Sequence, residues 1–163
     1  MSWRRAVAVL ICMTGSGIGC SNTNDEAWVL DQRSYTLGGI GSFAEMVDAG
    51  VKRLALSAPL PPAEMDLLVE HAGRIAADHN VEIYRESDFL VTDLFSADLT
   101  AGMDVLLICN DKTRQDYMEL KAVKQALVES EAYEGEARRQ IAVRFGYLLS
   151  YSDEKIESLL SNR

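Results

Sequence analysis

The chain alternates between short apolar runs and segments in which apolar residues recur every three or four positions. The clearest run is 104–109, Asp-Val-Leu-Leu-Ile-Cys. Its nearly continuous apolar character predicts a strand buried on both faces, as at the centre of a parallel sheet. Shorter runs at 53–58 and 81–85 predict two further strands. Residues 89–91 either extend the second of these or begin another strand after a turn.

Helical periodicity follows the first strand. Pro59, Pro61 and Pro62 end the run 53–58 and open a helix, because proline fits the first helical position, where no N–H donor is needed. Asn80 closes this helix. The apolar residues that predict its buried face are Met65, Leu68, Ala72, Ile75 and Ala76.

The last third of the chain is predicted to be entirely helical. Asn110-Asp111 caps a long helix, and Glu134-Gly135 breaks it. A last helix begins after Ser152, and Asp153 and Glu154 lie favourably in its first turn, near the positive end of the helix dipole. The helix between these two buries Ile141, Phe145, Leu148 and Leu149.

The segment before the first strand predicts a glycine loop and a short helix. Residues 27–37 predict a strand or an irregular lead-in. Ser42-Phe43-Ala44-Glu45 matches a capping box, in which the hydroxyl and the carboxylate bind free N–H groups at a helix start. We therefore expect a helix over 42–49 that stops at Gly50, with residues 38–42 forming the loop before it.

These signals together predict an α/β fold. Strand and helix segments alternate through most of the chain, which favours a small, mainly parallel sheet flanked by helices in two or three layers, with an all-helical C-terminal third. That third is expected to pack against the sheet as a hairpin. Residues 27–163 are long enough to bury one core, so a single domain is expected there.

The first twenty residues predict export. Arg4 and Arg5 precede a short apolar run at 6–13, and small residues lead up to Cys20, as in a secretory signal peptide. The run is shorter than the roughly 20 apolar residues that span a bilayer. Gly17-Ile18-Gly19-Cys20 resembles the lipobox of bacterial lipoproteins, in which the cysteine thiol is acylated and the cysteine becomes the new N-terminus.

This resemblance implies an exported protein that is anchored to a lipid bilayer, on the periplasmic or the cell-surface side. Residues 1–19 are then the signal peptide, and Cys20 carries the lipid. Residues 20–26 contain mainly Ser, Asn, Thr, Asp and Glu, which predicts a flexible tether. Gly17 stands where that family usually has leucine, so ordinary secretory cleavage or an uncleaved anchor is the alternative.

The net negative charge of the chain argues against nucleic acid and anionic lipid as partners. Removal of residues 1–19 takes away Arg4 and Arg5, so 14 of the 16 basic residues remain against 25 acidic ones, a net charge of −11. Nucleic acid is therefore not expected as a partner, because phosphate backbones bind basic patches. The same charge disfavours docking on anionic lipid, so the acylated cysteine alone would hold the protein on a bilayer.

Cysteine use predicts a domain without disulfides. Cys12 lies in the signal peptide, and Cys20 is the predicted lipidation site. Only Cys109 remains, inside the apolar run. A buried thiol on a strand behaves as a small hydrophobic side chain, and catalysis by this thiol is the alternative.

The predicted parallel sheet also predicts a binding site. Loops after parallel strands meet helix N-termini at one edge of the sheet, and ligands bind there. Residues 39–44 match G-x-G-x-x-A, a pattern that lets backbone amides approach a phosphate, whereas the alternative is a plain turn before a capped helix. The candidate ligand-binding residues are Gly39, Gly41, Ser42, Ser57, Asn110 and Asp111.

Neither a cofactor nor a metal is expected. His71 and His79 lie eight positions apart, and this spacing does not form the i, i+4 pair of helical metal sites. No G-x-S-x-G motif marks a serine nucleophile.

Two classes of function remain. The first is a membrane-tethered lipoprotein domain that acts as a binding or interaction module for a protein partner or a small ligand. The alternative is a small hydrolase or transferase that uses polar residues at the carboxyl ends of the strands, with Glu86 and Asp88 as paired carboxylates. The alternative is strongly favoured if Ser42, Ser57, Asp88, Asn110 and Asp111 converge in one pocket, and it is disfavoured if they are scattered.

Overall fold

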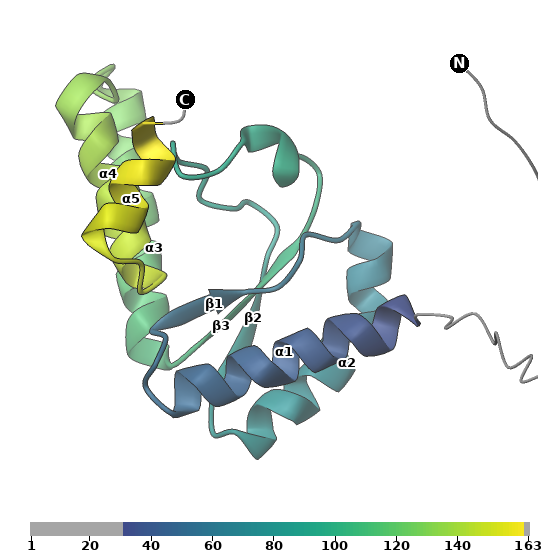
Figure 1. Cartoon of the computed structure of the whole chain (residues 1–163). Helices are drawn as coiled ribbons and strands as arrows, with labels where there is room; N and C mark the ends of the chain where they lie inside the picture. The colour runs from purple at the N-terminus through teal and green to yellow at the C-terminus, as the bar shows by residue number, and fades with distance from the viewer. Residues whose placement is uncertain (1–30, 162–163) are drawn as a thin grey trace, which may run out of the picture.

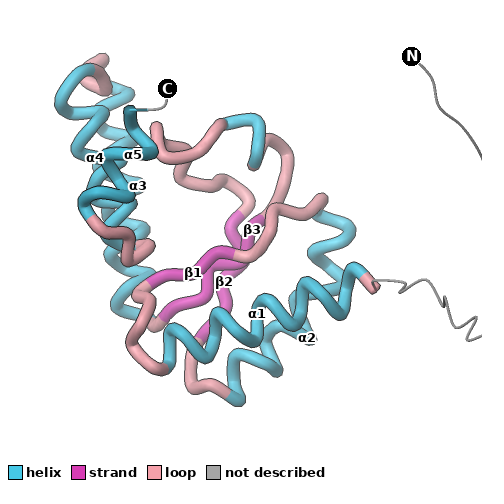
Figure 2. Tube along the Cα trace, viewed as in Figure 1, coloured by secondary structure: helices cyan, strands magenta, loops and turns pink. Residues whose placement is uncertain are grey.

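The most apolar run of the chain forms the central strand of the sheet. The computed structural model describes residues 31–161, in which β3 (Val105–Cys109) lies between β1 (Leu54–Leu56) and β2 (Glu82–Glu86) (Figure 2). All five residues of β3 are buried. The predicted burial of this strand on both faces is confirmed.

The sheet is antiparallel, so the prediction of a mainly parallel sheet is wrong. β3 runs antiparallel to both neighbours, and Cys109 lies opposite Leu54 of β1 and Glu82 of β2. A strand that is covered on both faces becomes a continuous apolar run whichever way its neighbours point. The run therefore indicates burial and not direction.

Helices cover both faces of this sheet and form three layers (Figure 1). One face carries α1 (Gln32–Asp48) and α2 (Pro62–Asp78), which lie below the sheet in the figure. The other face carries the C-terminal helices, at the left of the same view. These are α3 (Asp111–Glu129), α4 (Gly135–Leu148) and α5 (Asp153–Ser161).

Alternate residues of β3 enter two separate cores, because successive side chains of a strand point to opposite faces. Leu106 and Ile108 pack with α1 and α2, whereas Leu107 and Cys109 pack with the C-terminal helices. In the second core Phe145 contacts three other aromatic rings, with centroid distances of 5.7 to 6.1 Å. These rings belong to Phe89, Phe95 and Tyr117.

The order of elements explains the sheet. β1, α2 and β2 form a crossover between two strands that point the same way, and β3 inserts between them as in a split β-α-β unit. The long connection from β2 to β3 contains the short 3₁₀ helix η1 (Ala97–Leu99). Residues 89–91 form no strand. Instead, the Leu90 amide donates to the Tyr117 hydroxyl at 3.0 Å.

Helix α1 begins ten residues before the predicted start. The Asp31 carboxylate caps it by accepting a hydrogen bond from the Ser34 amide at 3.1 Å. The predicted lead-in is therefore wrong for residues 32–37, which are helical, and the predicted glycine loop at 38–42 is wrong as well. Residues 27–30 lie outside the described part.

The capping-box interpretation of Ser42 is also wrong. Ser42 lies inside α1, and its hydroxyl donates to the Gly38 carbonyl at 3.1 Å. Each glycine in a helix costs about 1 kcal/mol relative to alanine. Burial of Ile40, Ala44 and Val47 offsets this cost, because these side chains lie in the core that α1 shares with α2.

The long helix α3 ends at Glu129, five residues before the predicted break at Glu134-Gly135, and Gly135 is instead the first residue of α4. Three other helix ends follow the sequence signals. Pro62 is the first residue of α2, and Asn80 lies just beyond its end with a φ of 52°. Asn110 caps α3 by accepting a hydrogen bond from the Thr113 amide at 2.9 Å. The Ser152 hydroxyl accepts one from the Lys155 amide at 3.3 Å at the start of α5.

No helix within residues 31–161 combines the length and the apolar character needed to span a membrane. The predicted signal peptide (1–19), Cys20 and the predicted tether lie outside the described residues.

Candidate functional site

The antiparallel sheet separates the predicted ligand residues. Ser57 follows β1, and its amide donates to the Leu106 carbonyl near the start of β3, at 3.0 Å. Asn110 and Asp111 follow the other end of β3, because Cys109 lies opposite the first residue of β1. The one shared edge that a parallel sheet would provide therefore does not exist.

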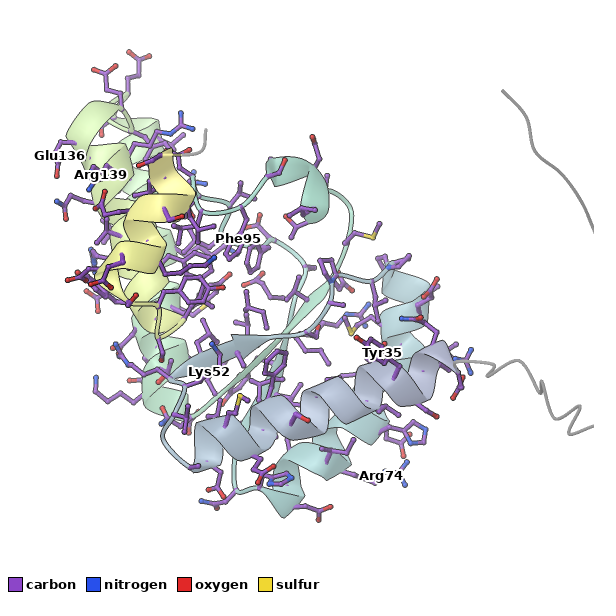
Figure 3. All side chains as sticks on the ribbon, in the orientation of Figure 1. Tyr35, Lys52, Arg74, Phe95, Glu136 and Arg139 are labelled. Carbon is purple, nitrogen blue, oxygen red and sulfur yellow. The ribbon has the colours of Figure 1, made fainter. Side chains whose placement is uncertain are left out.

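Three of the six predicted residues nevertheless line one groove. Gly39 and Ser42 of α1 and Ser57 after β1 all line a groove of about 630 Å³. We call this the α1 groove. Its lining is completed by Gln32, Ser34, Tyr35, Thr36, Gly38, Ile40, Phe43 and Ala58. Figure 3 labels Tyr35, which lies in the first turn of α1.

Gly41 does not belong to this lining. A Cβ on Gly41 would lie 3.5 Å from Cγ2 of Ile75, so this glycine faces α2. By contrast, a Cβ on Gly38 or Gly39 would meet no atom within 4 Å. The groove therefore runs along a bare stretch of helix surface.

The chemistry of the α1 groove suits binding more than reaction. Among the described residues that line it, none carries a carboxylate, an imidazole, an amine, a guanidinium or a thiol. Nucleophilic catalysis by a hydroxyl needs such a base within hydrogen-bond reach. The Ser34 hydroxyl donates to the carboxylate of Asp31, which as the N-cap of α1 also accepts from the Ser34 amide. The hydroxyls of Thr36, Ser42 and Ser57 donate to the backbone carbonyls of Gln32, Gly38 and Ala58, at 2.8, 3.1 and 2.9 Å.

Ser57 has a clear structural role. It is buried, and its hydroxyl accepts a hydrogen bond from the Leu106 amide at 2.9 Å while donating to the Ala58 carbonyl. The hydroxyl thus binds a backbone N–H of β3 just past the end of β1, where that group would otherwise be buried without a partner.

Asn110 and Asp111 hold the start of α3. Asn110 is the N-cap, and Asp111 Oδ1 accepts a hydrogen bond from the Tyr84 hydroxyl at 2.6 Å. The Arg114 guanidinium lies 4.0 Å from the centroid of the same ring. Burial, followed by the hydrogen bonds to Asp111 and Glu82, raises the pKa of Tyr84. The cluster of Glu82, Tyr84, Asp111 and Arg114 was not anticipated by sequence analysis, because β2 and α3 are distant along the chain.

Cys109 lies beside this cluster but is fully buried. Burial raises the pKa of its thiol to about 12. The thiol is therefore protonated near neutral pH, whereas a nucleophilic cysteine reacts as the thiolate.

Glu86 and Asp88, the candidate paired carboxylates, bind one lysine. Lys121 Nζ lies 3.2 Å from Glu86 Oε1 and 2.9 Å from Asp88 Oδ2, and it also donates to the Asp88 carbonyl. Lys124 Nζ donates to the Val91 carbonyl at 2.8 Å. The two lysines thus hold the segment after β2 against α3.

Within residues 31–161, no three His, Cys, Asp or Glu side chains are placed to share a metal ion. His71 Nδ1 instead lies 2.7 Å from an Arg74 guanidinium nitrogen on the same helix. No protein-family model matches the chain, and it has no significant similarity to a curated protein or to a solved structure.

Proposed function

We propose that the chain is an exported lipoprotein, anchored to a bilayer through acylated Cys20, whose α/β domain acts as a binding or interaction module. The observation that carries this proposal is the lipobox-like sequence Gly17-Ile18-Gly19-Cys20 after a basic and apolar leader. Acyl chains on Cys20 would supply the membrane affinity, at about 0.8 kcal/mol per buried methylene.

The α1 groove supports the binding part of the proposal. Ligand pockets combine apolar and aromatic walls with a few polar groups that orient the ligand. The groove has this composition, with Tyr35, Ile40 and Phe43 as apolar walls and Gln32 as a side-chain amide. It is the place where residues of α1 and of the segment after β1 meet at the surface.

The arrangement argues against the hydrolase or transferase alternative. That alternative is favoured by convergence of Ser42, Ser57, Asp88, Asn110 and Asp111 in one pocket, but Ser57 and Asn110 lie at opposite ends of the sheet. The Ser57 hydroxyl is bound to two backbone groups, and Asp88 is paired with Lys121.

Intact mass and membrane fractionation test the anchoring. The wild-type chain is expected in the membrane fraction, with a mass that begins at Cys20 and includes acyl chains. Cys20→Ser is expected to lack the added mass. Cys12→Ser is the matched control, because it removes a cysteine of the leader and leaves Cys20 in place. Wild-type protein that is soluble and unacylated would refute the lipoprotein assignment.

In-cell photocrosslinking tests the binding module. A photoreactive amino acid at Ser42, in the groove, is expected to form a discrete adduct heavier than the chain. The same group at Ala77, on the exposed side of α2, serves as the control. Adducts that are identical from both positions, or that are absent from Ser42, would argue against a partner in the groove.

A further inference from the structure

A second pocket lies between α3 and α4 and shares no residue with the α1 groove. Its volume is about 230 Å³, and we call it the α3–α4 pocket. The two helices lie side by side, and Arg53 directly precedes β1 (Figure 1). Leu120 and Leu148 are the buried apolar residues of the lining. The rest of the lining is Tyr147 and four ionisable side chains, those of Arg53, Asp116, Glu119 and Arg144.

Two of these charged side chains are paired with each other. Arg53 Nη2 lies 2.7 Å from Asp116 Oδ2, and Lys112 Nζ lies 3.3 Å from Asp116 Oδ1. The Arg53 amide also donates to the Ser150 hydroxyl at 2.9 Å, which holds this segment near the end of α4. Both oxygens of Asp116 therefore bind cations, so the pair forms a wall of the pocket and offers no unpaired carboxylate.

The other two charged side chains are unpaired. Among residues 31–161, neither the Glu119 nor the Arg144 side chain makes a hydrogen bond or an ion pair. Both line the α3–α4 pocket, yet they form no ion pair with each other. Exposed charges of opposite sign gain little from pairing in water, so the two groups can stay apart at small cost. A ligand with one charge of each sign, placed between them, would satisfy both.

The balance of charge in the lining selects the class of ligand. Its two arginines and two acidic residues sum to zero. A simple anion would be attracted by Arg144 and repelled by Glu119, and a simple cation would meet the reverse. A zwitterion avoids both penalties. A guanidinium group binds a carboxylate through two parallel hydrogen bonds, and an ammonium group donates charge-assisted hydrogen bonds to a carboxylate.

We propose that the α3–α4 pocket binds a free α-amino acid with an apolar side chain, its carboxylate on Arg144 and its ammonium group on Glu119. The two buried leucines of the lining supply an apolar floor. The Tyr147 ring supplies a wall, which is held in place because its hydroxyl donates to Asp153 Oδ1 at 2.8 Å. The pocket is smaller than the roughly 300–1,000 Å³ of sites for drug-sized ligands, which suits a molecule the size of an amino acid.

This inference goes beyond the proposed function, because the site is separate from the α1 groove and does not depend on acylation of Cys20. Methyl NMR titration of the purified protein tests it, with L-leucine as the probe. We expect saturable shifts of the Leu120 and Leu148 methyl signals. L-Leucinamide keeps the ammonium group and lacks the carboxylate, whereas isocaproate keeps the carboxylate and lacks the ammonium group. Each should bind at least about tenfold more weakly, because a charge-assisted contact is lost.

Charge-neutralising variants assign the two contacts. Arg144→Gln should weaken L-leucine binding about tenfold and leave the affinity for L-leucinamide unchanged or improved. Glu119→Gln should weaken L-leucine binding to a similar extent and leave the affinity for isocaproate unchanged or improved. Both variants should keep the wild-type unfolding midpoint, because neither side chain has a partner among residues 31–161. Arg33→Gln is the matched control, because Arg33 is an exposed helical arginine of α1 outside this pocket, and it should leave all three affinities unchanged.

The proposal is overturned if neither L-leucine nor any other standard amino acid gives a saturable shift. Equal binding of L-leucine and either analogue would also overturn it, because only one charge would then be recognised. Saturable shifts confined to the methyl signals of Ile40 would place the ligand in the α1 groove instead. Photocrosslinking at Ser42 and membrane fractionation report on the proposed function separately, so the two proposals can fail independently.

Discussion

Ser57, Tyr117 and Lys124 each bind a backbone group near the sheet or in the segment after β2. The Ser57 hydroxyl accepts a hydrogen bond from the Leu106 amide of β3, and the Tyr117 hydroxyl accepts one from the Leu90 amide. Lys124 donates to the Val91 carbonyl. Among the described residues, no buried side-chain nitrogen or oxygen lacks a hydrogen-bond partner. Several residues with catalytic potential in the sequence are therefore committed to the fold.

Asp104 is the clearest buried charge. It is 3% exposed, and its Oδ2 lies 2.5 Å from Arg85 Nε, while Arg85 also binds Asp66 of α2 and the Pro62 carbonyl. A buried carboxylate needs such a partner, because removal from water is costly. The pair joins β2 to the start of β3 and to α2, which is a structural role.

Burial of Cys109 predicts a pH dependence of stability. The raised pKa, about 12 against 9.0 for a free thiol, means that the unfolded chain ionises first. The thiol therefore favours the folded state below pH 9.0, and this contribution is lost as the pH rises from 9.0 to about 12. From about pH 8 to about pH 10, wild type should lose more free energy of unfolding than Cys109→Ala.

Urea denaturation at the two pH values measures this difference, and alkylation provides a second readout. Iodoacetamide should label Cys109 in denaturant and leave it unmodified in the folded protein. Rapid labelling of the folded protein would contradict the burial and would return Cys109 to the candidate nucleophiles.

Gly146 permits the close approach of α4 and α5. A Cβ at this position would lie 2.6 Å from Cγ1 and 2.7 Å from Cδ1 of Ile156. Gly146→Ala should therefore lower the free energy of unfolding by about 1–3 kcal/mol, as overpacked cores do. The control Gly73→Ala, with open space around it, should raise it by about 0.5–1 kcal/mol. Denaturant titration measures the free energy of unfolding of both variants. A Gly146→Ala variant more stable than wild type would contradict the close approach of Gly146 to Ile156.

At the scale of elements, α1 departs most from the sequence-based prediction. Glycine, serine and a capping-box pattern indicate a loop and a helix start near residue 42, and local propensity supports that interpretation. The helix forms from Gln32 because its buried side packs with α2 over the sheet, and these contacts are invisible in a local pattern.

Cap substitutions distinguish the two helix starts. Asp31→Ala should lower stability, whereas Ser42→Ala should leave it unchanged or raise it slightly, because Ser42 lies mid-helix. Hydrogen bonds from Ser34 lower the pKa of Asp31. The cap therefore stabilises the fold above the ordinary carboxylate pKa of 3.8 and loses this effect as the pH falls through the lowered value.

Urea denaturation of the two variants at neutral and acid pH is the measurement. The gap between wild type and Asp31→Ala should close in acid. A larger loss for Ser42→Ala than for Asp31→Ala would place the helix start at residue 42.

At the scale of the whole molecule, two cores on either side of one small sheet stabilise the described residues. Cys109 is the one cysteine among residues 31–161, so no disulfide forms within that part. The stability of the described residues therefore comes from packing without a cross-link among them.

Reductant should consequently leave the thermal unfolding midpoint of the processed protein unchanged. The expected result is a superimposable transition with and without a thiol reductant, followed by circular dichroism. Non-reducing electrophoresis is the companion measurement. A dimer that disappears on reduction would show that Cys20 is a free thiol, against the lipidation proposal.

The sequence by itself determined the local features of this protein. The apolar run 105–109 indicated a strand covered on both faces, and Pro62, Asn110 and Ser152 marked helix starts, because burial and capping depend on neighbouring residues. The lipobox-like sequence is likewise a local signal, and lipidation of Cys20 stays a prediction.

Only the tertiary structure decided strand direction and the positions of distant residues. An apolar strand has the same composition in a parallel and an antiparallel sheet, so the sequence could not show that Ser57 and Asn110 lie at opposite ends. It also could not show that Gly39, Ser42 and Ser57 line one groove, because that groove exists only where α1 packs beside the end of β1. Long-range packing determines both.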